Sequence, residues 1–147
     1  MGHTNKINSK MNKEDFCLVD SSTTHTILKD KKYFQSLKLC KANVNTISGS
    51  LNLIEGSGRA IIMLPKGTKL CIDDALYSSK SNRNLLRFKD IRYNGYHIET
   101  NNDGNEEFLC IISIVSDQKL ILEKLPIFSS GLYYTTMRTI ETNVAIH

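Results

Sequence analysis

The sequence predicts an all-β fold, namely a small closed or partly closed barrel with one short helix. The first observation is a series of short apolar runs of strand length, rich in Ile, Val, Leu and Tyr: FCLV (16–19), KANVNTI (41–47), LNLI (51–54), RAIIMLP (59–65), TKLCIDDALY (68–77), YHIET (96–100), EFLCIISIV (107–115), KLILEKL (119–125) and GLYYTT (131–136). The second is that the intervening spacers SGS, EGSG, PKG, NGY and NNDGN supply the Gly, Asn and Pro that tight turns require. A length of 147 residues suits one domain.

The ends of the chain differ in composition from the middle. Residues 1–15 are polar and offer almost nothing to bury, so we expect a flexible N-terminal arm. The barrel then occupies 16–136, and 137–147 is expected to be a frayed tail because it lacks periodicity and turn residues. Within the barrel, 25–37 is expected to be a short helix or an irregular loop. The segment NRNLLRFKDIRYNG predicts the helix, near 84–93, because its apolar residues form one face and Asn-Gly provides a C-cap.

Composition excludes several classes of function. The net charge is +4, but the basic residues are scattered and the chain has no tryptophan, so direct nucleic-acid binding is not predicted. The first residues lack the apolar core of a signal peptide, and no apolar run is long enough to span a membrane. We therefore expect a soluble, cytoplasmic protein.

The cysteines and histidines do not predict a metal site. Cys17, Cys40, Cys71 and Cys110 lie far apart, without a CxxC pair and without a histidine at zinc-finger spacing. Each cysteine lies in an apolar run, which is typical of a small buried side chain in a reducing compartment. We expect neither a metal nor a cofactor.

Asp20 is the strongest candidate for chemistry. It follows the apolar run FCLV and precedes Ser21, Ser22 and two threonines. One interpretation is ordinary turn chemistry, because Asp and Ser side chains bond to their own backbone. The other is an aspartic-protease loop, which needs two carboxylates sharing a proton. The chain contains one such loop, so the second aspartate would come from a second copy across a two-fold axis. Ser21 would then brace the loop.

The remaining candidates are weaker. Gly56-Ser57-Gly58 is expected in a hairpin rather than between a strand and a helix, so it does not predict a phosphate site. Asp73 and Asp74 are adjacent on a strand and should point to opposite faces, which disfavours a joint acid–base pair. His25 is the histidine nearest Asp20 in the sequence, and an exposed loop position is expected for it.

Four blocks, taken in order, resemble the protease region of copia-type LTR retrotransposon Gag-Pol polyproteins, as found in plant genomes. CLVDSSTTH is similar to the strand that leads into Asp-Ser-Gly-Ala-Ser/Thr and a histidine. NLIEGSGRAII is similar to a glycine-containing middle block, DDALYSSKSNRNLLRFKDIRYNGYHIE to the block around Asn-Leu-Leu-Ser, and SSGLYYT to the closing Gly-Leu-Tyr. The resemblance covers about Phe16 to Thr136.

The resemblance implies a retropepsin-like barrel that cuts the polyprotein as a homodimer. Carried over by position, Asp20 is the catalytic aspartate and Ser21 the hydroxyl that braces the active-site loops. Two positions depart from the family pattern. Ser22 stands where a glycine is expected, by substitution or by deletion of one residue, and Arg87 stands where a serine is expected.

Three functions follow from these observations. The chain is expected to be a fragment of a Pol polyprotein, since the upstream zinc knuckle and the downstream pre-integrase segment of the family are absent from it. Such a fragment is either a protease-like barrel that no longer cleaves or a working homodimeric aspartic endopeptidase that acts on polyprotein peptides. The alternative from another class is a non-catalytic β-barrel interaction module.

Overall fold

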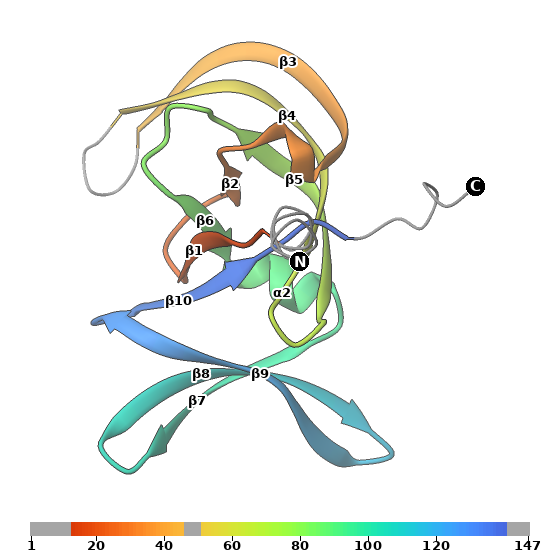
Figure 1. Cartoon of the computed structure of the whole chain (residues 1–147), viewed down its shortest axis with the longest axis vertical. Helices are drawn as coiled ribbons and strands as arrows, with labels where there is room; N and C mark the ends of the chain where they lie inside the picture. Colours follow the sequence, from red (N-terminus) through yellow and green to blue (C-terminus); the bar gives the residue numbers. More distant parts are fainter. Residues whose placement is uncertain (1–12, 46–50, 141–147) are drawn as a thin grey trace, which may run out of the picture.

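Ten strands form one continuous sheet in the computed structural model, which describes residues 13–45 and 51–140 (Figure 1). The spatial order is β3-β4-β5-β2-β6-β1-β10-β9-β8-β7. The strands are β1 (Asp15–Asp20), β2 (Ile27–Leu28), β3 (Phe34–Asn45), β4 (Leu51–Met63), β5 (Lys69–Tyr77), β6 (Asn84–Arg87), β7 (His97–Asp103), β8 (Glu106–Val115), β9 (Gln118–Ser129) and β10 (Leu132–Met137). A 3-10 helix η1 (Lys31–Tyr33) and an α-helix α2 (Phe88–Tyr93) accompany them.

The sheet curls until its middle strands close into a barrel. The residue after β10, Arg138, exchanges two backbone hydrogen bonds of 2.8 and 2.9 Å with Met63 at the end of β4. This pairing joins both ends of the series β4-β5-β2-β6-β1-β10. The barrel wall therefore has an inside that can be filled by apolar side chains, which include Val19, Leu28, Ile62, Leu70, Ile72, Leu86 and Met137.

The remaining strands extend the sheet beyond the closed part. β3 pairs with β4 alone and arches over the upper part of the molecule in Figure 1. β9, β8 and β7 continue from β10 and form the lower part. Leu109 and Leu125, from β8 and β9, still reach the core, so this extension is packed against the barrel.

The predicted all-β barrel with one short helix is confirmed, with a shift in where the helix begins. The helix was expected near 84–93, but 84–87 forms strand β6 and the helix begins at Phe88. Its C-cap is Asn94, and Gly95 follows with φ of +89°, as the Asn-Gly signal predicts. The ambiguous segment 25–37 contains β2, the 3-10 helix and the start of β3.

The EGSG segment is not a turn, because β4 runs through it without interruption. Its two glycines are needed for a different reason, which is the close approach of β3. A Cβ atom on Gly56 would lie 2.8 Å from the carbonyl oxygen of Lys38, and one on Gly58 would lie 2.0 Å from that of Ser36. Here glycine serves backbone packing between two long curved strands.

The remaining sequence predictions concern a hairpin, the cysteines, one turn and the two ends of the chain. The NNDGN hairpin is present between β7 and β8, with Gly104 at φ of +69°. Cys17 and Cys110 are buried as expected, whereas Cys40 is exposed. The SGS turn, residues 1–12 of the predicted arm and 141–147 of the predicted tail lie outside the described residues.

The close approach at Gly58 gives a stability test. We expect Gly58→Ala to lower the free energy of unfolding by about 2 kcal/mol or more, because β3 must move away from the new methyl group. Urea unfolding followed by circular dichroism measures the change. Ser57→Ala, one residue earlier on β4, is the matched control and should change stability little. Equal stability of the two variants would contradict the packing role.

Candidate functional site

Strand β6 lies between two strands that are consecutive in the sequence. β1 pairs with β6 in parallel and β2 pairs with it antiparallel, so β6 separates β1 from β2. The loop 21–26, which joins β1 to β2, must therefore pass the C-terminal end of β6. The register places Asp20 beside Arg87 at this end. Residues about 67 positions apart in the sequence thus meet at one edge of the barrel.

Asp20 is the last residue of β1 and is partly exposed. Along β1, Cys17 and Val19 belong to the core, so alternation places Phe16, Leu18 and Asp20 on the other face. The Asp20 Oδ1 atom accepts a 2.9 Å hydrogen bond from the backbone N–H of Ser22. Within the described part of the chain, Oδ2 accepts no hydrogen bond. The carboxylate is therefore held by its own turn and still offers one oxygen to a partner.

The serines after Asp20 do not strain the loop. Ser21 and Ser22 are both exposed. In residues 13–45 and 51–140, positive φ at non-glycine positions occurs only at Ser116 and Asp117. Ser22 therefore adopts an ordinary backbone conformation at the position where the resemblance leads us to expect glycine. A serine fits this loop without a conformational cost.

Arg87, at the end of β6, links the loop 21–26 to helix α2 through hydrogen bonds. The Thr26 hydroxyl accepts a 3.0 Å hydrogen bond from the backbone N–H of Arg87 and donates a 2.6 Å bond to Asp90 Oδ2. The Arg87 guanidinium donates to the carbonyl of Thr24 at 2.8 Å and to Asp90 Oδ1 at 3.0 Å. Thr26 and Asp90 are buried, so their polar groups depend on these partners.

At the start of β6, the Asn84 side chain forms hydrogen bonds with β1 and with the residue just after β2. Its Nδ2 donates a 3.0 Å hydrogen bond to the carbonyl of Phe16 on β1. Its Oδ1 accepts a 2.9 Å hydrogen bond from the backbone N–H of Lys29, just after β2. The Asn84 side chain is only 6% exposed. Its two hydrogen bonds take the place of backbone pairing where the short strands end. Both ends of β6 therefore hold β1 and β2 in place.

The weaker sequence candidates do not join this site. His25 Nε2 lies 3.6 Å from Asp74 Oδ2, and its Nδ1 lies 3.2 Å from the Thr24 hydroxyl. Asp73 pairs with Arg59 at 3.3 Å. The two adjacent aspartates thus have different partners and do not form a joint acid–base pair. No cluster of three or more His, Cys, Asp or Glu side chains suited to a metal ion occurs among the described residues.

Two ionisable groups on and near β1 have shifted pKa values. Burial raises the pKa of the Cys17 thiol to about 12, so Cys17 is not a nucleophile near neutral pH. Burial would also raise the pKa of Asp15, but hydrogen bonds from Tyr33 and Lys32 outweigh it and lower that pKa below its usual value. Asp15 is therefore ionised, and its charge is offset by Lys32 at 2.9 Å.

The sequence predicts Asp20 and Ser21 as site residues, but it did not lead to the residues that position their loop. Arg87 was noted only as a departure from a small hydroxyl, whereas it contacts Thr24, Thr26 and Asp90. One signal was available, because Arg87 and Asp90 stand three positions apart, a spacing at which opposite charges pair on a helix. A buried carboxylate requires a cation or several donors. Arg87 supplies the cation from three positions away, but the sequence could not say that a further donor, Thr26, comes from a loop 64 residues away.

Two further findings concern the class of protein. In the part of the chain that the structure covers, no helix combines the length and apolar character needed to cross a membrane. A family model described as Pol polyprotein, beta-barrel domain, matches residues 17–96, more than half of the chain. The matched range contains the loop after Asp20 and both ends of β6. No curated protein matches the chain.

The contacts of Thr26 predict a specific loss of stability. In Thr26→Val the backbone N–H of Arg87 and the Asp90 carboxylate each lose a buried partner. We expect the free energy of unfolding to fall by about 1–3 kcal/mol, measured by urea titration. Thr24→Val is the control, because the Thr24 side chain is exposed. If both valine variants are equally stable, the Thr26 contacts do not hold the loop.

Proposed function

We propose that this chain, which belongs to the family of Pol polyprotein β-barrel domains, is the aspartic-protease-like barrel of a copia-type retrotransposon Pol polyprotein. In this proposal Asp20 is one half of a catalytic pair, and a second copy of the chain supplies the other half. The substrate is an extended polyprotein peptide, and the domain acts in the cytoplasm.

The observation that carries the proposal is the position of the Asp20 carboxylate. Asp20 is the last residue of a buried strand and is partly exposed. One of its carboxylate oxygens accepts a hydrogen bond from the Ser22 N–H, and the other accepts none from the residues that the structure describes. The loop behind it is held by buried hydrogen bonds to Thr26 and by the Arg87 guanidinium. A fixed carboxylate with a free oxygen is what acid–base chemistry on a water molecule requires.

A second copy is required because one carboxylate cannot act as both acid and base in the same step. Two Asp20 side chains about 3 Å apart would share one proton, since like charges at that distance do not both ionise. The ionised member takes a proton from water as the water oxygen attacks the peptide carbonyl carbon. The protonated member gives its proton to the carbonyl oxygen, which produces a tetrahedral diol. The C–N bond then breaks as the first member passes its proton to the leaving amine nitrogen and the second takes a proton from the diol, which restores the pair. Ser21 would brace the two loops against each other.

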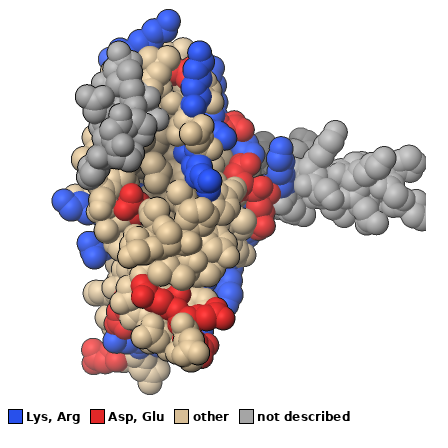
Figure 2. Space-filling model, turned by 90° about the vertical axis from the view of Figure 1, so that its left-hand side faces the viewer, with Lys and Arg blue, Asp and Glu red and all other residues tan. Residues whose placement is uncertain are grey.

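The surface around the end of β1 is compatible with such an approach. β1 points toward the left in Figure 1, and Figure 2 views the molecule from that side. A broad area of this side carries no Lys, Arg, Asp or Glu, with acidic residues gathered below it. Two copies that meet here bring the Asp20 carboxylates together, and the uncharged area adds no further like charges to desolvate.

A non-catalytic interaction module is the second candidate, and one feature favours it. β8 and β9 continue past the start of β7, where His97 pairs with Ile112, as a two-stranded projection. Its aliphatic side chains are about half exposed, namely Ile114, Val115, Leu120 and Ile121. Exposed apolar groups of this kind mark interaction surfaces. The two candidates differ in whether Asp20 is needed for any activity.

Asp20→Asn tests the proposed chemistry. We expect the wild-type chain to cleave members of a peptide panel, and a statine-type transition-state mimic to inhibit it. Asp20→Asn should abolish detectable cleavage, because an amide cannot take the proton from water. Mass spectrometry of the peptide products provides the measurement.

Asp103→Asn serves as the matched control, because Asp103 is an exposed carboxylate at the end of β7, paired with Lys124 at 3.1 Å. It should cleave like the wild type. If the wild type and Asp20→Asn process the panel equally, Asp20 is not catalytic and the interaction module becomes the better account.

A further inference from the structure

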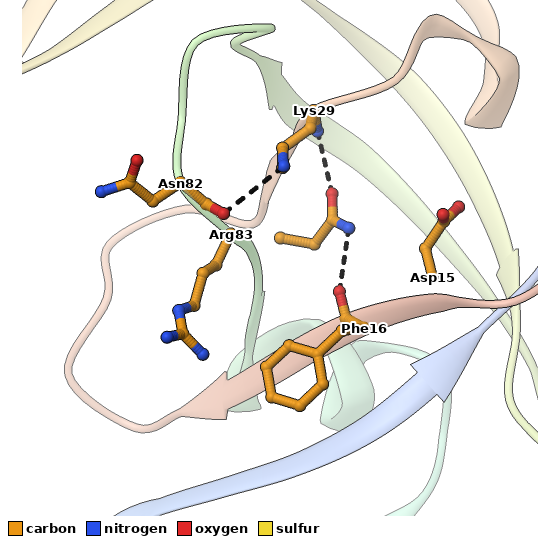
Figure 3. Close-up of a pocket in the computed structure, with 6 residues that line it drawn as sticks. Asp15, Phe16, Lys29, Asn82 and Arg83 are labelled. Carbon is orange, nitrogen blue, oxygen red and sulfur yellow. Dashed lines mark hydrogen bonds between the residues drawn. The ribbon is translucent and has the colours of Figure 1, made fainter.

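An open polar pocket lies beside the start of β1. Its volume is about 390 Å³, and it is lined by Asp15, Phe16, Lys29, Asn82, Arg83 and Asn84 (Figure 3). The segment just after β2 supplies one wall, the turn before β6 supplies another, and β1 supplies the floor. The pocket therefore exists because β6 is inserted between β1 and β2.

Most polar groups in this pocket already have partners. Both amide atoms of Asn84 are used in holding β1 and β2 together. The Asp15 carboxylate accepts a hydrogen bond from Tyr33 and pairs with Lys32. These groups shape the wall. The side chains with donors to spare are the two cations of the pocket, Lys29 and Arg83, and the amide of Asn82.

Arg83 is oriented by aromatic rings. Its guanidinium carbon lies 5.5 Å from the ring centre of Phe16 and 5.2 Å from that of Phe128. Phe16 in turn stacks on Tyr134, with ring centres 5.7 Å apart. Within the described ranges no carboxylate pairs with Arg83. These cation–π contacts hold the guanidinium near the two rings and leave its N–H groups able to bind an anion.

Lys29 completes the cationic edge. Its Nζ makes one long contact, 3.4 Å, to the carbonyl oxygen of Asn82. An ammonium group has three donors, so two remain. Lys29 and Arg83 both line the pocket, so a carboxylate bound in it lies near two positive charges and can accept a charge-assisted hydrogen bond from either.

One wall of the pocket, the Phe16 side chain, lies on the same face of the sheet as Asp20, whereas Asp15 and Asn84 lie on the core side of their strands. Phe16 and Asp20 are four residues apart on β1 and both point away from the core, which places them about 13 Å apart. An extended peptide covers that distance in about four residues. A peptide bound at Asp20 can therefore place one side chain in the pocket.

We propose that this pocket binds the carboxylate of an acidic side chain in an extended peptide, about four residues from the bond held at Asp20. The distance from the bond rests on the proposed function, whereas the carboxylate site itself does not. The pocket favours a peptide over a nucleic acid, because its two cations match the single negative charge of one peptide carboxylate. A polyanion requires a continuous basic stripe.

Binding of matched peptides to the full chain tests the inference. The probes are two terminally blocked eight-residue peptides that differ only in Glu or Gln at one position, and a single-stranded oligothymidylate of eight nucleotides. Binding is measured by isothermal titration calorimetry on the Asp20→Asn chain, which cannot consume a peptide. We expect the Glu peptide to bind about fivefold more tightly than the Gln peptide, a gain typical of a partly exposed charged hydrogen bond.

Three variants locate the effect. Arg83→Gln should remove the Glu preference, and Arg83→Lys should retain only part of it because the fork of donors is lost. Lys38→Gln is the matched control, because Lys38 is an exposed cation on β3 away from the pocket and its loss should preserve the preference. Thermal unfolding of each variant confirms that it folds.

Several outcomes would overturn the proposal. Equal affinity for the Glu and Gln peptides, or no measurable binding of the Glu peptide, excludes a carboxylate site. Tighter binding of the oligothymidylate that Arg83→Gln abolishes would assign the pocket to nucleic acid instead. Because the chain used here carries Asn at position 20, these results are independent of whether the wild-type chain cleaves.

Discussion

The insertion of β6 between β1 and β2 is the constraint on which the rest of this structure depends. Because β6 lies between them, β1 and β2 do not pair with each other, although they are consecutive in the sequence. The loop that joins them must therefore cross the end of β6. Asn84 and Arg87, at the two ends of β6, convert this crossing into a rigid arrangement through buried hydrogen bonds. The position of Asp20, and the pocket beside Phe16, are both consequences of that arrangement.

Buried polar side chains also hold separate segments together by hydrogen bonds elsewhere in the barrel. Glu123 of β9 is 2% exposed and accepts hydrogen bonds from the backbone N–H groups of Lys66 and Thr68, which fixes the turn between β4 and β5. Throughout the described part of the chain, every buried side-chain nitrogen and oxygen has a hydrogen-bond partner. Thr26, Asn84 and Glu123 join segments that are distant in the sequence, so each contributes to the specificity of the fold as well as to its stability.

The local part of this structure was predictable from the sequence, and the non-local part was not. Strands and turns depend on nearby residues, so the apolar runs and the Asn-Gly and Asp-Gly signals placed them well. Gly56 and Gly58 were read as a turn because glycine favours turns, yet here the backbone of β3 passes too close for any side chain. Arg87 looked like a substitution for a serine because its partners lie some 60 residues earlier. Asp20 could be predicted as a candidate because strand-to-loop patterning is local, whereas the pocket at Arg83 required the fold.

The central claim is that Asp20 acts only as a pair contributed by two chains. The most direct measurement is sedimentation equilibrium of the purified wild-type chain over a range of micromolar concentrations. The account predicts a reversible association that reaches the mass of two chains, with cleavage per chain rising in proportion to the dimer. A chain that stays monomeric at every concentration cannot assemble the pair and would contradict the account.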